Sequence, residues 1–139
     1  MHFTDYIRDG KVIKGQKDFQ KAKALVKMSK DSIDFLATMK ISDQSVTMIC
    51  VNYYEALRQI LEAMSLQEGY KVLSHEAYTS YLKEKGEVSL AEKFDRLRKL
   101  RNGANYYGKP IPKEVTESAK TDVISMVGVL KKKYIQDDS

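Results

Sequence analysis

The 139-residue sequence has no tryptophan and contains little cysteine, histidine or proline. With a single cysteine, Cys50, the fold needs no disulfide, and the apolar residues around Cys50 predict a small buried side chain rather than a nucleophile. The two histidines, His2 and His75, form no His-x-x-x-His or Glu-x-x-His pattern, and Cys-x-x-Cys is absent. These absences argue against a zinc or di-iron centre, so we expect no metal and no cofactor.

Other absences narrow the classes of function further. The sequence has no complete phosphate loop of the G-x-x-x-x-G-K-[ST] type and no motif for Ser/His/Asp acyl transfer. It has no long uncharged apolar stretch, so we expect no membrane span. Residues 1–15 also lack the apolar core of a signal peptide. Together these absences predict a cytoplasmic protein without a membrane partner.

The composition is that of a folded globular chain. Hydrophobic residues make up 42% and charged residues 31% of the sequence, and the length predicts one domain over residues 1–139. The net charge of +5 permits acidic or nucleic-acid partners without requiring them. The charge is concentrated in residues 93–101, which hold five cations against one anion, Asp95.

Apolar residues recur with the period of an α-helix along most of the chain. They predict helices at 17–39, 42–66, 74–85, 89–107 and 112–134. Phe19, Ala22, Val26, Ile33 and Leu36 form the expected buried stripe of the first long helix. We therefore predict an all-α, up-down bundle of four long helices plus one shorter helix, with the second long helix at its centre.

Capping and turn residues set the expected ends of these helices. Ser42 or Asp43 is the expected cap of the second helix, and Gly69 its stop. Ser89 and Glu92 have the spacing of a capping box, which predicts a sharp start for the fourth helix. Residues 1–16 are expected to be a loosely structured lead-in with a short helical turn at 3–7. The tail at 136–139 is expected to be frayed.

The segment 96–109 (RLRKLRNGANYYGK) is the most informative part of the sequence for function. It joins phosphate-binding cations to amide groups and stackable aromatics. The arginine fork suits phosphate oxygens, and on a helix Arg101 and Asn105 are neighbours. The alternative is a polar helix C-cap. The candidate nucleotide- or RNA-binding residues here are Arg98, Arg101, Asn102, Asn105, Tyr106 and Tyr107.

A second cluster lies within one turn of the second helix. This cluster lies outside the most apolar face of the helix and consists of Tyr54, Glu55 and Arg58. Glu55 and Arg58 are three residues apart and form a surface salt bridge in one interpretation. In the other, Glu55 orients the functional arginine, Arg101, and both Glu55 and Arg58 belong to the binding site.

Residues 101–107 (RNGANYY) and 52–58 (NYYEALR) carry a resemblance to a known family. The chain resembles the HEPN superfamily, the higher eukaryotes and prokaryotes nucleotide-binding domain. Members are compact helical bundles whose hallmark is an Arg, a polar residue and, a few residues on, a His on a late helix. The resemblance implies nucleotide or RNA binding through Arg101, a homodimer, and a minimal nucleotidyltransferase as partner in a toxin–antitoxin-like pair.

The sequence departs from that hallmark because Asn105 or Tyr106 stands where the histidine is expected. Neither titrates near neutral pH, so binding is favoured over cleavage. The rival hypothesis is a metal-independent ribonuclease with a variant site, whose candidate catalytic residues are Arg101, Asn105 and Tyr106. His75 is expected to be a surface or capping residue. A third hypothesis is an interaction module that binds an acidic protein through Arg96 and Lys99.

Overall fold

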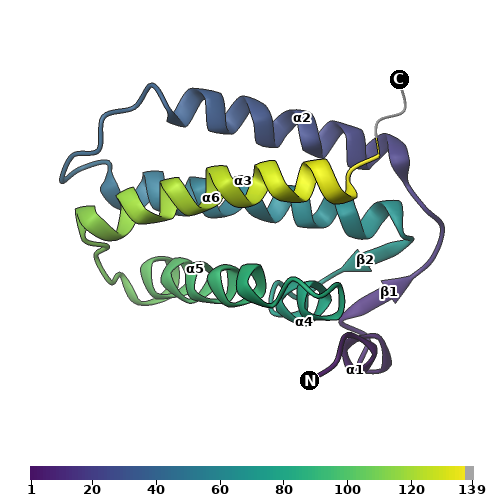
Figure 1. Cartoon of the computed structure of the whole chain (residues 1–139). Coiled ribbons are helices and arrows are strands. Elements are labelled where there is room, and N and C mark those ends of the chain that lie inside the picture. The colour runs from purple at the N-terminus through teal and green to yellow at the C-terminus, as the bar shows by residue number, and fades with distance from the viewer. Residues whose placement is uncertain (137–139) are drawn as a thin grey trace.

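The computed structural model describes residues 1–136 and has six helices and one two-stranded sheet among them. Four helices of 18 to 22 residues form the bundle, and each runs antiparallel to the long helix that precedes it in the sequence, as Figure 1 shows. The all-α bundle predicted from the sequence is therefore confirmed. The elements are α1 Phe3–Arg8, β1 Val12–Lys14, α2 Phe19–Leu36, α3 Val46–Gln67, β2 Tyr70–Val72, α4 Ala77–Glu84, α5 Val88–Tyr107 and α6 Lys113–Tyr134.

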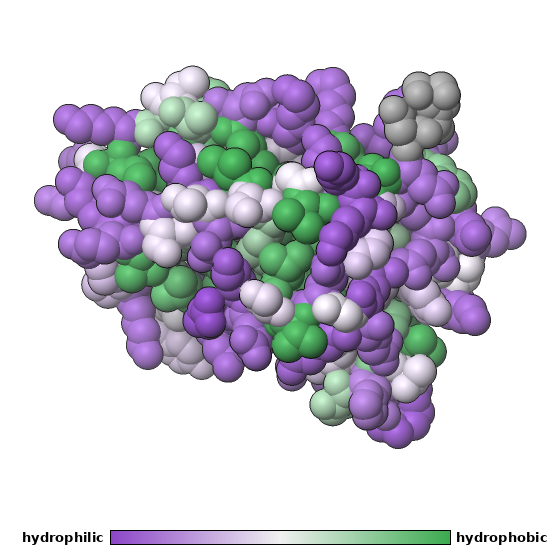
Figure 2. All heavy atoms as spheres, viewed as in Figure 1, coloured by the Kyte–Doolittle hydropathy of each residue, from purple (hydrophilic) through white to green (hydrophobic). Residues whose placement is uncertain are grey.

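Helix α3 is the centre of the bundle, as its wide apolar face predicts. It packs against α2, α5 and α6 and contributes the largest set of buried residues. Ile49, Tyr53, Leu57 and Ile60 are fully buried at helical spacing, and each aliphatic side chain of this kind contributes about 1.5–3 kcal/mol when it leaves water. Little of this core reaches the surface: the face in Figure 2 is mostly hydrophilic, with apolar patches between.

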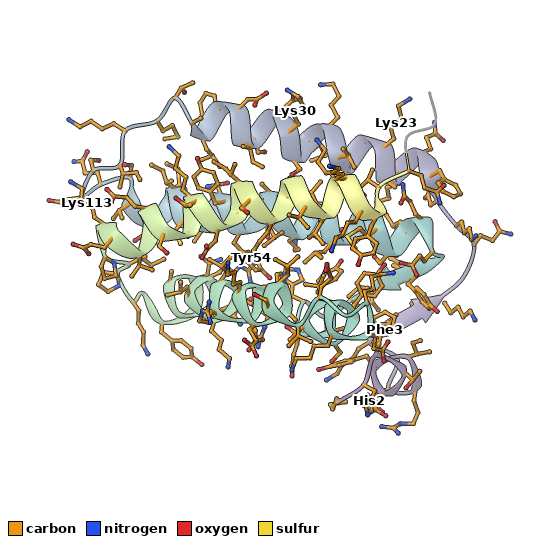
Figure 3. The ribbon with its side chains drawn as sticks, in the orientation of Figure 1. His2, Phe3, Lys23, Lys30, Tyr54 and Lys113 are labelled. Carbon is orange, nitrogen blue, oxygen red and sulfur yellow. The ribbon has the colours of Figure 1, made fainter. Side chains whose placement is uncertain are left out.

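Helix α2 covers one side of α3. The predicted stripe is correct at Ala22 and Leu36, which are buried, but wrong at Phe19, which is 42% exposed. Ser29 lies in the buried stripe because its hydroxyl donates to the Ala56 carbonyl oxygen at 2.7 Å, which satisfies the polar group. The outer face of α2 carries charged side chains such as Lys30, which points away from the bundle in Figure 3.

The residues predicted to cap α3 and α5 do not form those caps. Helix α3 begins after Ser45, which exchanges hydrogen bonds with Ser42 in a preceding turn, rather than at Ser42 or Asp43. The predicted Ser89–Glu92 capping box is not formed. Residue Gly86 adopts a positive φ of 82°, so the chain has already turned and α5 begins at Val88.

The N-terminal segment is ordered, which corrects the expectation of a loosely structured lead-in over 1–16. Helix α1 buries Phe3 and Tyr6, and β1 pairs with β2 in antiparallel register, Val12 opposite Val72. The Phe3 ring lies 5.2 Å from the Tyr70 ring in an edge-on arrangement. Three-residue strands are too short to show the alternation that predicts a strand. Of the expected frayed tail, 136–139, all but Gln136 lies outside the described residues.

No helix within residues 1–136 is long and apolar enough to cross a membrane. In the same residues, no three His, Cys, Asp or Glu side chains are grouped closely enough to hold a metal ion.

The turn after α3 gives the first testable prediction. Gly69 has a φ of 90°, and a Cβ atom there would lie 2.6 Å from the Gly15 carbonyl oxygen. We expect Gly69→Ala to lower the free energy of unfolding by about 2–4 kcal/mol, because the strained φ and the backbone clash add. Gly86→Ala, with φ 82° but open space around it, is the matched control and should lose only about 1–2 kcal/mol. Urea unfolding measures both variants, and an equal loss of unfolding free energy in the two would show that the clash with Gly15 contributes nothing.

Candidate functional site

Helix α5 divides the basic run 93–101 between two faces. Successive residues turn by about 100°, so cations three apart share a face and those between them point elsewhere. Arg98 and Arg101 line a cavity next to the segment before α4. Lys93 and Arg96 instead line the side of α5 that faces α6. The run is therefore two surfaces rather than one basic patch.

The first surface is a cavity of about 360 Å³, here called the His75–Arg101 cavity. Its α5 wall is basic and polar, and its other wall is the turn that precedes α4. That turn is made by hydrogen bonds between residues three apart, such as Ala77 N–H to the Ser74 carbonyl oxygen, so the regular helix starts later than the predicted residue 74. The lining residues are Leu73, Ser74, His75, Glu76, Arg98, Arg101, Asn102 and Tyr106.

Arg101 is the central cation of this cavity. The carbon of its guanidinium lies 6.0 Å from the centre of the Tyr54 ring and 5.8 Å from that of Tyr106. One terminal nitrogen donates to Asn102 Oδ1 at 3.3 Å. The Nε atom is buried without a hydrogen-bond partner, and no carboxylate forms an ion pair with Arg101 within residues 1–136. An arginine so placed is an uncompensated charge that favours an anion.

His75 faces the same cavity from the other wall. Its Nδ1 lies 2.9 Å from the Tyr54 hydroxyl, which leaves Nε2 for a ligand. Burial lowers the pKa of His75, and the charges of Arg58 and Arg101 lower that pKa further, against the opposite effect of Glu55. The imidazole is therefore neutral at pH 7.

Tyr54 joins the cavity to the core. It is almost fully buried, and its ring stacks on Phe94 with 5.5 Å between centres and 26° between planes. Figure 3 labels it between α3 and α5. Burial raises the pKa of Tyr54, and the nearby Glu55 carboxylate raises that pKa further, so the phenol keeps its proton. A protonated phenol can either donate to His75 Nδ1 or accept from it. If it donates, the proton of the neutral imidazole is on Nε2; if it accepts, the proton is on Nδ1 and Nε2 has a free lone pair.

Arg98 lines the cavity but is already paired. It donates to Asp95 from Nε at 3.2 Å and from Nη2 at 2.8 Å, and its side chain is mostly buried. Asp95 also pairs with Lys99 at 3.1 Å and accepts from the Thr79 hydroxyl. Because a paired arginine has less charge to offer a ligand, Arg98 is secondary to Arg101 at this site.

The amide that contacts Arg101 is Asn102 rather than the expected Asn105. Asn105 is exposed and does not line the cavity. Of the two tyrosines, Tyr106 lines the cavity and is 69% exposed, which leaves ring surface for stacking. Tyr107 lies outside it, with the Lys109 ammonium 6.0 Å from its ring centre.

Glu55 does not orient Arg101, which corrects that prediction. Both Glu55 oxygens accept from Arg58 Nε, at 3.2 and 3.1 Å, and Arg58 also donates to Glu62 at 2.6 Å. The salt-bridge interpretation of this pair is the correct one. Arg58 and the two carboxylates do not line the His75–Arg101 cavity, and they act on it only through their charges.

Residues 103–109 show why spacing alone is a weak guide. They have the spacing G-x-x-x-x-G-K, although Pro110 follows where a phosphate loop has Ser or Thr. In the structure α5 continues through Gly103 to Tyr107, and Gly108 ends it with a φ of 62°. The Lys109 N–H donates to the Gly103 carbonyl oxygen at 3.1 Å. The backbone amides serve the helix and its cap, so this segment does not cradle a phosphate as a loop.

His75 is the site residue that sequence reasoning set aside. It lies 26 residues before Arg101, and no local motif connects the two. Only the packing of residues 73–76 against α5 brings the imidazole and the guanidinium to one cavity.

No protein-family model matches the chain, and a search of curated proteins found no significant match. The resemblance to the HEPN superfamily remains a prediction from residues 52–58 and 101–107.

Proposed function

We propose that the chain binds a phosphate-bearing ligand, a nucleotide or RNA, in the His75–Arg101 cavity. The observation that carries this proposal is the unpaired cation: Arg101 has no carboxylate partner within residues 1–136 and keeps a buried Nε without a hydrogen bond. A phosphate group offers Arg101 both a negative charge and hydrogen-bond acceptors, because guanidinium and phosphate match in charge and in geometry.

The rest of the cavity suits the same ligand. Its volume, about 360 Å³, falls within the range of small-ligand sites. Tyr106 offers an exposed ring for base stacking, and Asn102 offers an amide beside the cation. The resemblance to nucleotide-binding helical bundles also supports a nucleotide or RNA ligand. The homodimer and the nucleotidyltransferase partner rest on that resemblance alone.

Direct titration tests the proposal. Fluorescently labelled single-stranded RNA and a labelled adenine nucleotide are titrated with the protein at several salt concentrations. Binding should weaken as salt rises, because phosphate contacts release counterions. Unlabelled nucleotide should compete with the labelled probe. Absence of binding to either probe at low salt would refute the proposal.

A specific observation favours a second function, metal-independent RNA cleavage. The sequence argued against cleavage because the hallmark histidine is missing, yet His75 lies in the cavity with Arg101. With Nδ1–H donating to Tyr54, a neutral imidazole has a free Nε2 that can accept the proton of a ribose 2′-hydroxyl. That oxygen then attacks the neighbouring phosphorus, the bond to the 5′-oxygen breaks, and the leaving 5′-oxygen takes a proton from water, while the imidazolium of His75 later returns its proton to solvent. The products are a 2′,3′-cyclic phosphate and a 5′-hydroxyl.

This second function predicts that His75→Asn lowers the rate of cleavage by about 10²–10⁴-fold and leaves RNA affinity nearly unchanged. The rate should rise with pH through the lowered pKa of His75 and level off by neutral pH, because the base must be deprotonated. Chelator should have no effect. The measurement is gel analysis of labelled RNA with end-group identification. Intact RNA after long incubation with the wild-type protein would exclude this function and leave the binding proposal standing.

A further inference from the structure

The second face of the basic run borders a groove between α5 and α6. This α5–α6 groove has a volume of about 720 Å³, twice that of the His75–Arg101 cavity. The two helices pack only loosely against each other, whereas α3 packs closely against α6. The groove ends where residues 109–111 cross from α5 to α6.

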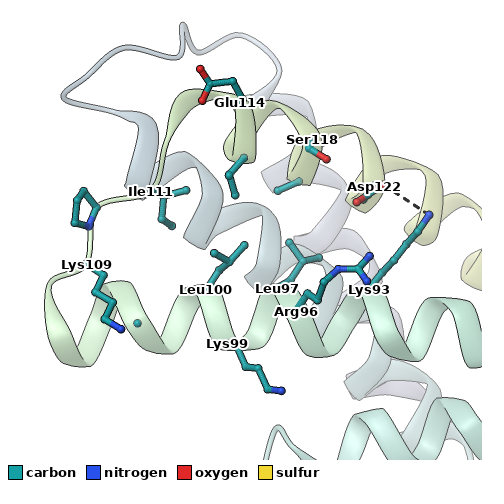
Figure 4. Close-up of a pocket in the computed structure, with 14 residues that line it drawn as sticks. Lys93, Arg96, Leu97, Lys99, Leu100, Lys109, Ile111, Glu114, Ser118 and Asp122 are labelled. Atoms are coloured by element: carbon teal, nitrogen blue, oxygen red, sulfur yellow. Dashed lines mark ion pairs between the residues drawn. The ribbon is translucent and has the colours of Figure 1, made fainter.

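The floor of the groove is aliphatic. Figure 4 shows Leu97, Leu100 and Ile111 pointing into the space between the two helices. Val115 and Ala119 complete the floor from α6. On the face shown in Figure 2, apolar surface is visible between hydrophilic residues on the α5 side of α6. An aliphatic floor at this spacing suits the apolar stripe of a helix.

The two rims differ in charge. Four cations line the groove from α5 and the following turn, whereas α6 contributes two carboxylates, Glu114 and Asp122. Lys93 pairs with Asp122 at 3.7 Å across the groove, as Figure 4 shows. Arg96 is exposed and forms no ion pair with any residue of the described chain. Lys99 points away from α6 in Figure 4 and pairs with Asp95, so Arg96 and Lys109 are the cations of this rim that form no ion pair within the described residues.

We propose that the α5–α6 groove docks an amphipathic helix of another protein, with its apolar stripe on the aliphatic floor and carboxylates facing Arg96. Residues 93–107 of α5 rise about 21 Å at 1.5 Å per residue, so a helix of about 14 to 16 residues fills the groove. Opposite charges along the rim fix the register and orientation of such a helix, while the buried aliphatic area supplies affinity.

The same features argue against nucleic acid as the occupant. The floor carries no aromatic ring on which a base stacks, since Tyr106 and Tyr107 lie outside the groove. Glu114 and Asp122 repel phosphate along the opposite rim. The groove therefore differs in kind from the His75–Arg101 cavity, and this proposal does not depend on the function proposed for that cavity.

A displayed peptide library tests the chemistry of the partner. It holds 16-residue helix-forming peptides with leucine fixed at helical spacing and with acidic, basic and neutral residues randomised beside the leucines. Selection on the full chain should enrich peptides that are acidic on one flank of the stripe. Enrichment of basic or neutral flanks, or no enrichment over a library with scrambled leucines, would overturn the proposal.

Variants then locate the binding site of the enriched peptide. Ser118 is exposed on the α6 rim, and Ser118→Trp should fill the groove and weaken peptide binding more than tenfold. Arg96→Glu should weaken it about tenfold. Lys132→Glu changes an exposed cation near the other end of α6 and should have no effect, as should Arg101→Ala. Circular dichroism checks folding, and Arg96→Glu decides the outcome if Ser118→Trp does not fold.

Two other occupants are outcomes of the same assay. If single-stranded RNA displaces the peptide and Arg96→Glu abolishes RNA binding, the groove binds nucleic acid and the proposal is wrong. If the protein forms dimers that Ser118→Trp dissociates, a second copy of the chain fills the groove and the proposal is again wrong.

Discussion

Arg101→Ala should weaken nucleotide and RNA binding by about ten- to a hundredfold. Hydrogen bonds to a charged group contribute about 1.5–3 kcal/mol each, and 1.4 kcal/mol corresponds to a tenfold change in affinity. The stability of the fold should change little. The substitution removes a guanidinium whose buried Nε has no partner, so no native ion pair is broken. Fluorescence titration measures the affinity, and urea unfolding confirms that the variant is folded.

Two matched variants identify what Arg101 contributes. Arg101→Lys keeps the charge but loses the planar fork, so its affinity should fall between those of the wild type and Arg101→Ala. Arg96→Ala removes a cation from the same helix on the α5–α6 groove side, and it should change affinity by less than threefold. If Arg96→Ala and Arg101→Ala weaken binding equally, the ligand senses only the net charge of α5, and the His75–Arg101 cavity is not the site.

The fold could be predicted because it depends on a local signal. Apolar residues at helical spacing on α3 report directly which face is buried, and Gly69 and Gly108 end their helices where the sequence expects an end. The short sheet could not be predicted. Val12 and Val72 are 60 residues apart, and only their pairing makes either segment a strand. The exposed Phe19 shows the same limit, because helical spacing places it on the predicted stripe, whereas the packing of α2 against α3 covers Ala22 and leaves Phe19 exposed.

The grouping of residues in the His75–Arg101 cavity was predicted in part, for a related reason. Arg101, Asn102 and Tyr106 lie within two turns of one helix, so their proximity follows from helix geometry alone. The position of His75 does not follow from helix geometry, because it depends on how the turn before α4 packs against α5. Glu55 illustrates the converse error. A carboxylate near the expected site suggested long-range orientation, but Arg58 is one turn away on the same helix and pairs with it.

The core behind the cavity gives the largest expected change in stability. Phe94 is fully buried, and its ring lies 5.5 Å from that of Tyr54 and 6.0 Å from that of Tyr78. Phe94→Ala should lower the free energy of unfolding by about 3–5 kcal/mol, because it removes the apolar contacts and leaves a cavity. That loss is a large part of the 5–15 kcal/mol that stabilises a typical domain. Urea unfolding measures it, and Val88→Ala, at an exposed position of the same helix, should change stability by less than about 0.5 kcal/mol.

A milder variant at the same position separates stability from site geometry. Phe94→Leu keeps the core apolar but removes the ring on which Tyr54 stacks. If that stack holds the Tyr54 hydroxyl against His75, Tyr54 gains freedom and water reaches the imidazole. Because burial is the largest cause of the lowered pKa of His75, that pKa should then rise toward the value of an exposed histidine. NMR titration of the imidazole resonances follows this change in the folded protein. An unchanged pKa of His75 in Phe94→Leu would mean that the turn before α4 holds His75 in place without the help of the aromatic stack.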